Sequence, residues 1–92
     1  SKWYTDYRHR NEVRMDKIKK LRLEVDEVDE KIMDLLHRRF ALTDEILGEK
    51  KVLSLGSFDG ERENQILEAA RRRSEAVEEV YQELLRISKE RI

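Results

Sequence analysis

The chain has 92 residues, enough for one domain, and 45% of them are charged. Its 20 basic and 21 acidic residues nearly balance, which argues against a general nucleic-acid-binding protein, because such proteins usually carry a basic excess. The absence of cysteine excludes disulfides and thiolate metal sites, and two histidines are too few for a histidine-rich metal site.

Neither a membrane span nor a targeting segment is predicted. No run of about 18 apolar residues is present, and residues 1–14 are too charged for a signal peptide. We therefore expect a cytoplasmic protein with no metal, no cofactor and no membrane or nucleic-acid partner.

Most of the chain is predicted to be helical. Residues 1–14 are polar and aromatic, and we expect a tail or a helical extension there, ahead of a helical domain over residues 15–92. From about residue 11 to residue 51 nothing interrupts a helix except Gly48, near its end. Alternating steps of three and four place one apolar stripe along this helix. The stripe consists of Ile18, Leu21, Val25, Val28, Ile32, Leu35, Leu42 and Ile46.

Two shorter helices are expected after a loop over residues 52–58. Asp59 is a suitable N-cap for a second helix that runs to about Arg72, and Ser74 is a suitable N-cap for a third. One face of the third helix carries Val77, Tyr81, Leu84, Ser88 and Ile92.

The unequal helix lengths predict a partner. A helix of about 40 residues is about 60 Å long, whereas helices of about 14 and 18 residues span roughly 20 and 27 Å. The two short helices could barely cover the long stripe, and soluble monomers rarely leave large apolar surfaces exposed. We therefore predict an all-α fold of three helices that forms an intertwined homodimer about a two-fold axis.

Two cations interrupt the apolar pattern of the long helix. Arg39 occupies a position of the stripe where leucine would be expected, and Lys50 follows about three turns later, within roughly 20° of it. Cations on a burying face are costly unless an anion meets them. Alternatively, Arg39 could have a purely structural role, in which it extends its charge to solvent or sets the register of helix pairing. Lys50 could likewise do no more than complement the helix dipole.

Four further residues extend the candidate site. Arg22 lies roughly 100° around the helix from Arg39, so it would reach a pocket only from a second chain. Asp59, Arg62 and Glu63 open the second helix, with Asp59 and Glu63 on one face. Arginines bind carboxylates through two parallel hydrogen bonds, and a carboxylate can accept a hydrogen bond from a hydroxyl. The set therefore suits a small dianion that carries a hydroxyl group.

This pattern resembles the all-helical chorismate mutase family. The resemblance covers about residues 18–92 and rests on motifs along the first two helices. These motifs are Leu21-Arg22, Val25-Asp26, Val28-Asp29, Arg39, Lys50 and Asp59-Gly60-Glu61-Arg62-Glu63.

The resemblance implies a reaction and a role for each residue on the first helix. The reaction is the concerted rearrangement of chorismate to prephenate in the shikimate pathway, which leads to phenylalanine and tyrosine. Arg39, with Arg22 from the partner chain, would clamp the two substrate carboxylates. Lys50 would donate to the ether oxygen of the breaking bond.

The remaining roles fall on the second and third helices. By the resemblance, Glu63 and the Asp59 region would hold the ring hydroxyl, and Arg62 would support them. Ser88 matches a serine that lies near a substrate carboxylate in the family.

One position departs from the family pattern. The family usually has glutamine four residues after the serine, as a second donor to the ether oxygen, whereas this chain has Ile92. Losing such a donor typically costs about 10²–10³ in rate. The alternatives are a related enzyme, such as an isochorismate pyruvate lyase or an aminodeoxychorismate mutase, and a non-catalytic helical dimer that binds a partner protein.

Overall fold

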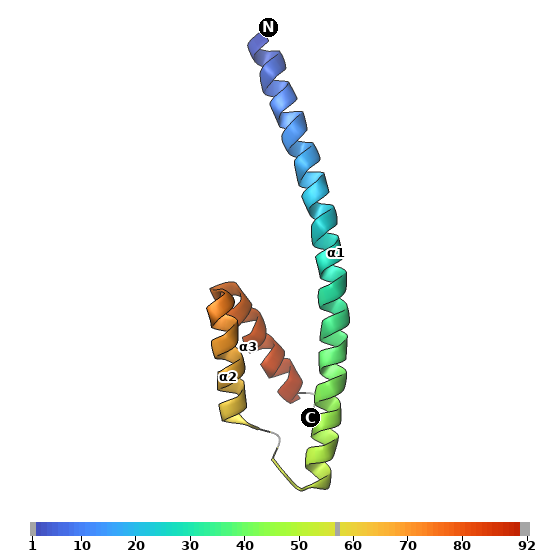
Figure 1. Ribbon diagram of the computed structural model, residues 1–92, viewed down its shortest axis with the longest axis vertical. Helices are drawn as coiled ribbons and strands as arrows, with labels where there is room; N and C mark the ends of the chain where they lie inside the picture. Colours follow the sequence, from blue (N-terminus) through green and yellow to red (C-terminus); the bar gives the residue numbers. More distant parts are fainter. Residues whose placement is uncertain (1, 57, 91–92) are drawn as a thin grey trace. The chain divides into compact units, whose positions relative to one another are not determined.

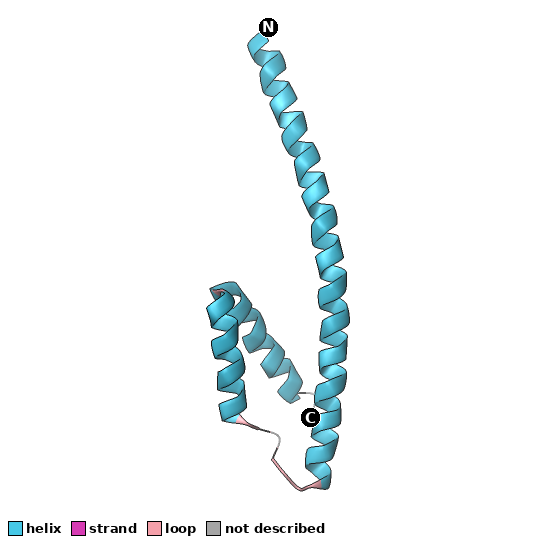
Figure 2. Cartoon of the chain, viewed as in Figure 1, coloured by secondary structure: helices cyan, strands magenta, loops and turns pink. Residues whose placement is uncertain are grey.

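The computed structural model describes residues 2–56 and 58–90, and helices account for all their regular secondary structure (Figures 1 and 2). The helices are α1 (Lys2–Val52), α2 (Gly60–Arg73) and α3 (Glu75–Glu90). The prediction of an all-α fold with three helices is confirmed. The chain divides into two compact units, one up to His37 and one from Arg38 onward.

Helix α1 begins before the apolar stripe that predicted it. It starts at Lys2, so residues 2–14 are helical and continuous with the rest of α1. Side chains four residues apart meet on a helix surface. The Trp3 and Tyr7 rings stack with their centroids 6.0 Å apart, and Arg8 Nε lies 3.4 Å from Glu12 Oε1. Such pairs support a helix without any tertiary contact.

Taken by itself, the N-terminal unit is one amphipathic helix with an uncovered stripe. Ile18 is 40% exposed, Leu21 48% and Leu35 63%. A single helix cannot bury its own apolar face, so this stripe needs another surface to cover it. None of the described helices is long and apolar enough to cross a membrane.

The end of α1 is closed by a hydrogen-bonded turn. Leu55 N donates to Lys50 O at 2.8 Å, and Ser54 N donates to Lys51 O at 3.1 Å. Ser54 has a φ of 57°, the left-handed conformation of the residue after a helix in the Schellman motif. The motif fixes the backbone of Lys50, and α1 extends one residue into the predicted loop.

Side chains cap both ends of the connection into α2 and α3. Asp59 Oδ1 accepts a hydrogen bond from Arg62 N at 3.0 Å, and Ser74 Oγ accepts one from Val77 N at 3.1 Å. Both predicted N-caps are confirmed. Ser74 also donates its own N–H to Ala70 O at 3.2 Å, so this single residue ends α2 and starts α3.

The two short helices form a hairpin around a small core (Figure 1). The buried apolar residues of the described chain are Ala70, Leu84 and Leu85. Burying a leucine side chain contributes about 1.5–3 kcal/mol, which is small against the conformational entropy that folding has to offset. The hairpin fixes where α2 starts and α3 ends, and both ends border the site described below.

Substituting Ser54 tests the left-handed turn that ends α1. Ser54→Gly should stabilise the protein by about 0.5–1 kcal/mol, because glycine adopts positive φ without a Cβ clash. Urea unfolding at one fixed protein concentration measures the difference. Ser54→Ala keeps the Cβ and should give no gain, so equal stabilisation by alanine would contradict this explanation.

Candidate functional site

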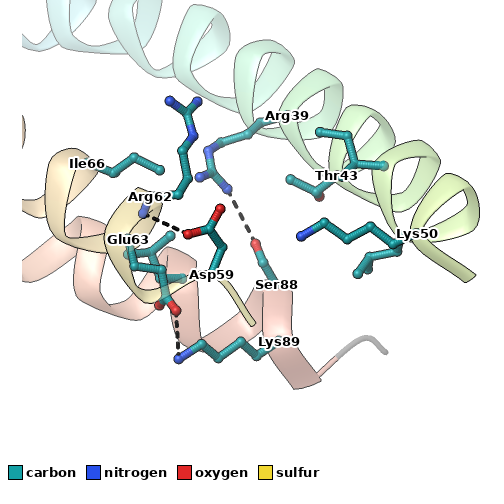
Figure 3. Close-up of a pocket in the computed structure, with 12 residues that line it drawn as sticks. Arg39, Thr43, Lys50, Asp59, Arg62, Glu63, Ile66, Ser88 and Lys89 are labelled. Carbon is teal, nitrogen blue, oxygen red and sulfur yellow. Dashed lines mark hydrogen bonds and ion pairs between the residues drawn. The ribbon is translucent and has the colours of Figure 1, made fainter. Parts of the chain in front are cut away.

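A pocket of about 190 Å³ lies within the C-terminal unit, between the end of α1, the start of α2 and the end of α3 (Figure 3). Its lining residues are Arg39, Thr43, Ile46, Leu47, Lys50, Asp59, Arg62, Glu63, Ile66, Leu85, Ser88 and Lys89.

The wall from α1 follows the helical repeat. Arg39, Thr43 and Leu47 recur every four residues, and Ile46 and Lys50 are also four apart, so all five share one face. The predicted orientation of Arg39 and Lys50 toward the same side of the helix is therefore what brings both to the pocket. Apolar side chains lie between the two cations and lower the local polarity.

Arg39 is held by contacts from α3. Its Nη1 donates to Ser88 Oγ at 3.3 Å, and its guanidinium carbon lies 6.0 Å from the centroid of the Tyr81 ring, within cation–π range. The Ser88 hydroxyl in turn donates to Leu84 O at 2.9 Å. The guanidinium is thus oriented before any ligand arrives.

Lys50 is half-buried and lies in the last turn of α1. Figure 3 shows its ammonium group directed into the space that Ser88 and Asp59 border. Within the part of the chain that the structure describes, no carboxylate pairs with it. The helix dipole favours a cation here, but it does not replace an anion in a half-buried pocket.

The two carboxylates of the pocket are already engaged. Asp59 caps α2 through the backbone N–H of Arg62. Glu63 Oε2 lies 3.0 Å from Lys89 Nζ, and the Glu63 side chain is 19% exposed. Both acids can still accept a further hydrogen bond, because a carboxylate has about four lone-pair sites.

The lining therefore carries more positive than negative charge. Arg39, Lys50, Arg62 and Lys89 face Asp59 and Glu63. A surplus of two charges matches a small dianion, and arginine can bind its carboxylates in parallel pairs. The lining contains neither histidine nor cysteine, and no cluster of the described residues could hold a metal ion. The charge of the lining therefore suits an anionic ligand.

Most of the predicted site residues meet in this pocket. They are Arg39, Lys50, Asp59, Arg62, Glu63 and Ser88. Arg22 lies on α1 in the N-terminal unit and is exposed, and its role stays a prediction. Ile92 lies outside the described residues.

Lys89 is the charged lining residue that the sequence reasoning missed. It follows Leu85 by four residues, so the helical repeat of α3 places these two lining residues on one face. That spacing was a signal, but a lysine near the end of a charged helix more commonly extends into solvent.

A comparison with known protein families identifies the family of the chain. A family model described as "Chorismate mutase type II" matches residues 21–91, more than three quarters of the chain. The chain therefore belongs to this all-helical family. No curated protein and no solved structure matches it significantly.

A hydroxy-dicarboxylate tests the surplus charge without any assumption about catalysis. L-malate at ten times its dissociation constant should stabilise the fold by about 1.4 kcal/mol, seen as a rise in the thermal midpoint. Lys50→Gln should remove most of this rise, whereas Lys51→Gln, on the exposed adjacent position, should keep it. A rise of the same size from sodium chloride at matched ionic strength would contradict specific binding.

Proposed function

From its place in the type II chorismate mutase family, we propose that the chain converts chorismate to prephenate, a step toward phenylalanine and tyrosine. One observation carries the proposal. Arg39 and Lys50 both face a pocket whose charge surplus suits a dicarboxylate, and Lys50 has no acidic partner among the described residues.

The reaction explains what the pocket contains. A carbon–oxygen bond breaks and a carbon–carbon bond forms within one molecule, with no proton transfer and no covalent enzyme intermediate. Such a reaction needs its reactant held in a near-attack shape. It also needs preorganised donors where negative charge grows in the transition state. A lining without histidine or cysteine is compatible with both needs.

Lys50 is the proposed transition-state donor. Its ammonium would donate to the ether oxygen as that oxygen gains charge, and the apolar Ile46 and Leu47 beside it would strengthen the interaction by lowering the local polarity. Arg39 would bind a substrate carboxylate, with its orientation set by Ser88 and Tyr81. Ser88 could donate to the same carboxylate by turning away from Leu84 O.

The start of α2 is the proposed binding site for the substrate hydroxyl. Glu63 would accept a hydrogen bond from this hydroxyl, with Asp59 beside it and Arg62 completing the cluster. The engagement of both carboxylates by other donors supports this role, because it fixes their directions.

A second copy of the chain is proposed to complete the site. The pocket of about 190 Å³ is smaller than the roughly 300–1,000 Å³ of typical ligand sites. The stripe of α1 is about half exposed, and the buried apolar core of the described residues consists of Ala70, Leu84 and Leu85. An intertwined homodimer would cover the stripe, and Arg22 of the other chain would then supply a second clamp for the substrate.

The first prediction from this proposal concerns Lys50. Lys50→Ala should lower kcat/KM for chorismate by about 10²–10³, the loss expected for one preorganised donor. Loss of chorismate absorbance measures the rate. Lys51→Ala is the matched control, because Lys51 is adjacent, exposed and absent from the pocket lining.

Equal rates for Lys50→Ala and the parent protein would refute the proposed role of Lys50. No rate above the uncatalysed background in the parent protein would refute the enzyme proposal, and Ile92 in place of the family glutamine makes a slow parent enzyme the expected result. Product analysis separates the related reactions, since a lyase releases pyruvate, a mutase of this type does not, and an aminodeoxychorismate mutase requires the amino substrate.

The second prediction concerns the contribution of Arg22 across chains. Arg22→Ala and Arg39→Ala homodimers should each be inactive. A heterodimer of the two has one intact site and one site that lacks both arginines, so random mixing of equal amounts should regain up to about one quarter of the parent activity. Sedimentation and tagged-chain capture verify the dimer and the exchange. Exchange without regained activity would contradict a site shared between chains, and a stable folded monomer at micromolar concentration would contradict the dimer.

A further inference from the structure

Lys89 makes two contacts that connect the end of α3 to the start of α2. Its Nζ lies 3.0 Å from Glu63 Oε2, and the Lys89 side chain is 49% exposed against 19% for Glu63. The same Nζ lies 4.6 Å from the centroid of the Phe58 ring. One ammonium group thus meets an acid and an aromatic face at the edge of the pocket.

The Phe58 ring is itself held against the first residue of α2. A Cβ on Gly60 would lie 3.2 Å from Phe58 Cζ and 3.3 Å from its Cε1, tighter than ordinary contact. Glycine at position 60 therefore leaves the space that the ring occupies. The cation–π contact is within the distance at which such pairs are attractive, so Phe58 gives Lys89 a second support beside Glu63.

The Lys89–Glu63 ion pair lies at the carboxylate that is proposed to accept a hydrogen bond from the substrate hydroxyl. A carboxylate that accepts a substrate hydroxyl must point in one direction, but it also repels a dianionic substrate. Two like charges held close together in a partly buried pocket repel each other more strongly than they would in bulk water. A cation fixed 3.0 Å from the acid offsets this repulsion and leaves the other lone pairs of Glu63 available.

We propose that Lys89 is a positioning residue: it holds and neutralises Glu63 so that the pocket accepts a dicarboxylate carrying a hydroxyl group. This inference rests on the proposed function and deepens it, since it assigns recognition of the hydroxyl to a pair of residues. Arg39 and Lys50 act on the carboxylates and the breaking bond, whereas Lys89 acts only through Glu63.

A double-mutant cycle on ligand binding tests the pair. Prephenate is the probe, because it is a dicarboxylate with a ring hydroxyl and its binding can be measured by calorimetry whether or not turnover is detected. Lys89→Met keeps the length of the side chain and removes its charge. Lys89→Met and Glu63→Gln should each weaken prephenate binding about tenfold, the size of one hydrogen bond to a charged group.

The double variant distinguishes an effect of Lys89 on the position of Glu63 from a direct effect of its charge on the ligand. If Lys89 acts through Glu63, the double variant should bind prephenate within about twofold of Glu63→Gln alone. Losses that multiply to about 100-fold would overturn the proposal, as would unchanged binding by Lys89→Met or absence of prephenate binding by the parent protein. Lys89→Arg should retain the parent affinity within about threefold.

Arg86 provides the matched control on the same helix. It hydrogen bonds to Glu83 outside the pocket lining, where its guanidinium lowers the pKa of that carboxyl. Arg86→Met removes the same charge and should leave prephenate binding unchanged. A loss as large as that of Lys89→Met would overturn the proposal in favour of net charge alone.

Kinetics with chorismate separates the inference from the proposed function. Lys89→Met should raise KM about tenfold and leave kcat within about twofold, since the hydroxyl is held alike in the ground state and the transition state. A parent protein that binds prephenate with a coupled Lys89–Glu63 pair but does not turn over chorismate would refute the enzyme proposal only. Turnover without coupling would refute the role of Lys89 only.

Discussion

A partly buried positive charge is costly unless a negative charge or another polar group lies beside it. In this pocket only some of the cations have such a partner. Lys89 meets Glu63, and the Arg39 guanidinium is supported by a hydroxyl and an aromatic ring. Lys50 has no acidic partner in the described chain. The cost of leaving such a group uncompensated is the physical reason to expect an anionic ligand.

The arrangement of the pocket is compatible with the division between substrate binding and polarisation that we propose. On the α2 and α3 side, Glu63 pairs with Lys89 and Asp59 caps α2, so the directions of these groups are set by the fold. Lys50 lies on the opposite wall among apolar side chains, and its backbone is fixed by the turn that closes α1. Preorganised donors in a site of low polarity are what electrostatic catalysis requires, so this arrangement supports the reaction that we propose.

The exposed apolar surface of the chain indicates that another surface covers it, just as the lack of an acidic partner for Lys50 among the described residues indicates that an anion binds beside it. The α2–α3 hairpin holds three buried apolar residues, and the stripe of α1 remains about half exposed. A protein with so small a core is marginal unless another surface contributes. The homodimer that we propose would supply apolar cover for α1 and a further arginine for the ligand, so stability and function would depend on the same association.

The sequence by itself determined the elements, because their causes are local. Helical periodicity predicted α1, and the side chains of Asp59 and Ser74 predicted where α2 and α3 begin, since a cap needs only the next three residues. The extension over residues 2–14 was left open between tail and helix, because its stability comes from pairs such as Trp3–Tyr7 rather than from an apolar stripe.

Periodicity also placed Arg39 and Lys50 on one face, and the family motifs pointed to all the charged residues of the pocket lining except Lys89. Only the tertiary structure decided how those charges pair. The contact of Lys89 with Glu63 joins residues of two different helices, and the support of Arg39 by Ser88 and Tyr81 joins α1 to α3. Such contacts depend on the angle and register at which helices pack, which residue spacing within one helix cannot specify.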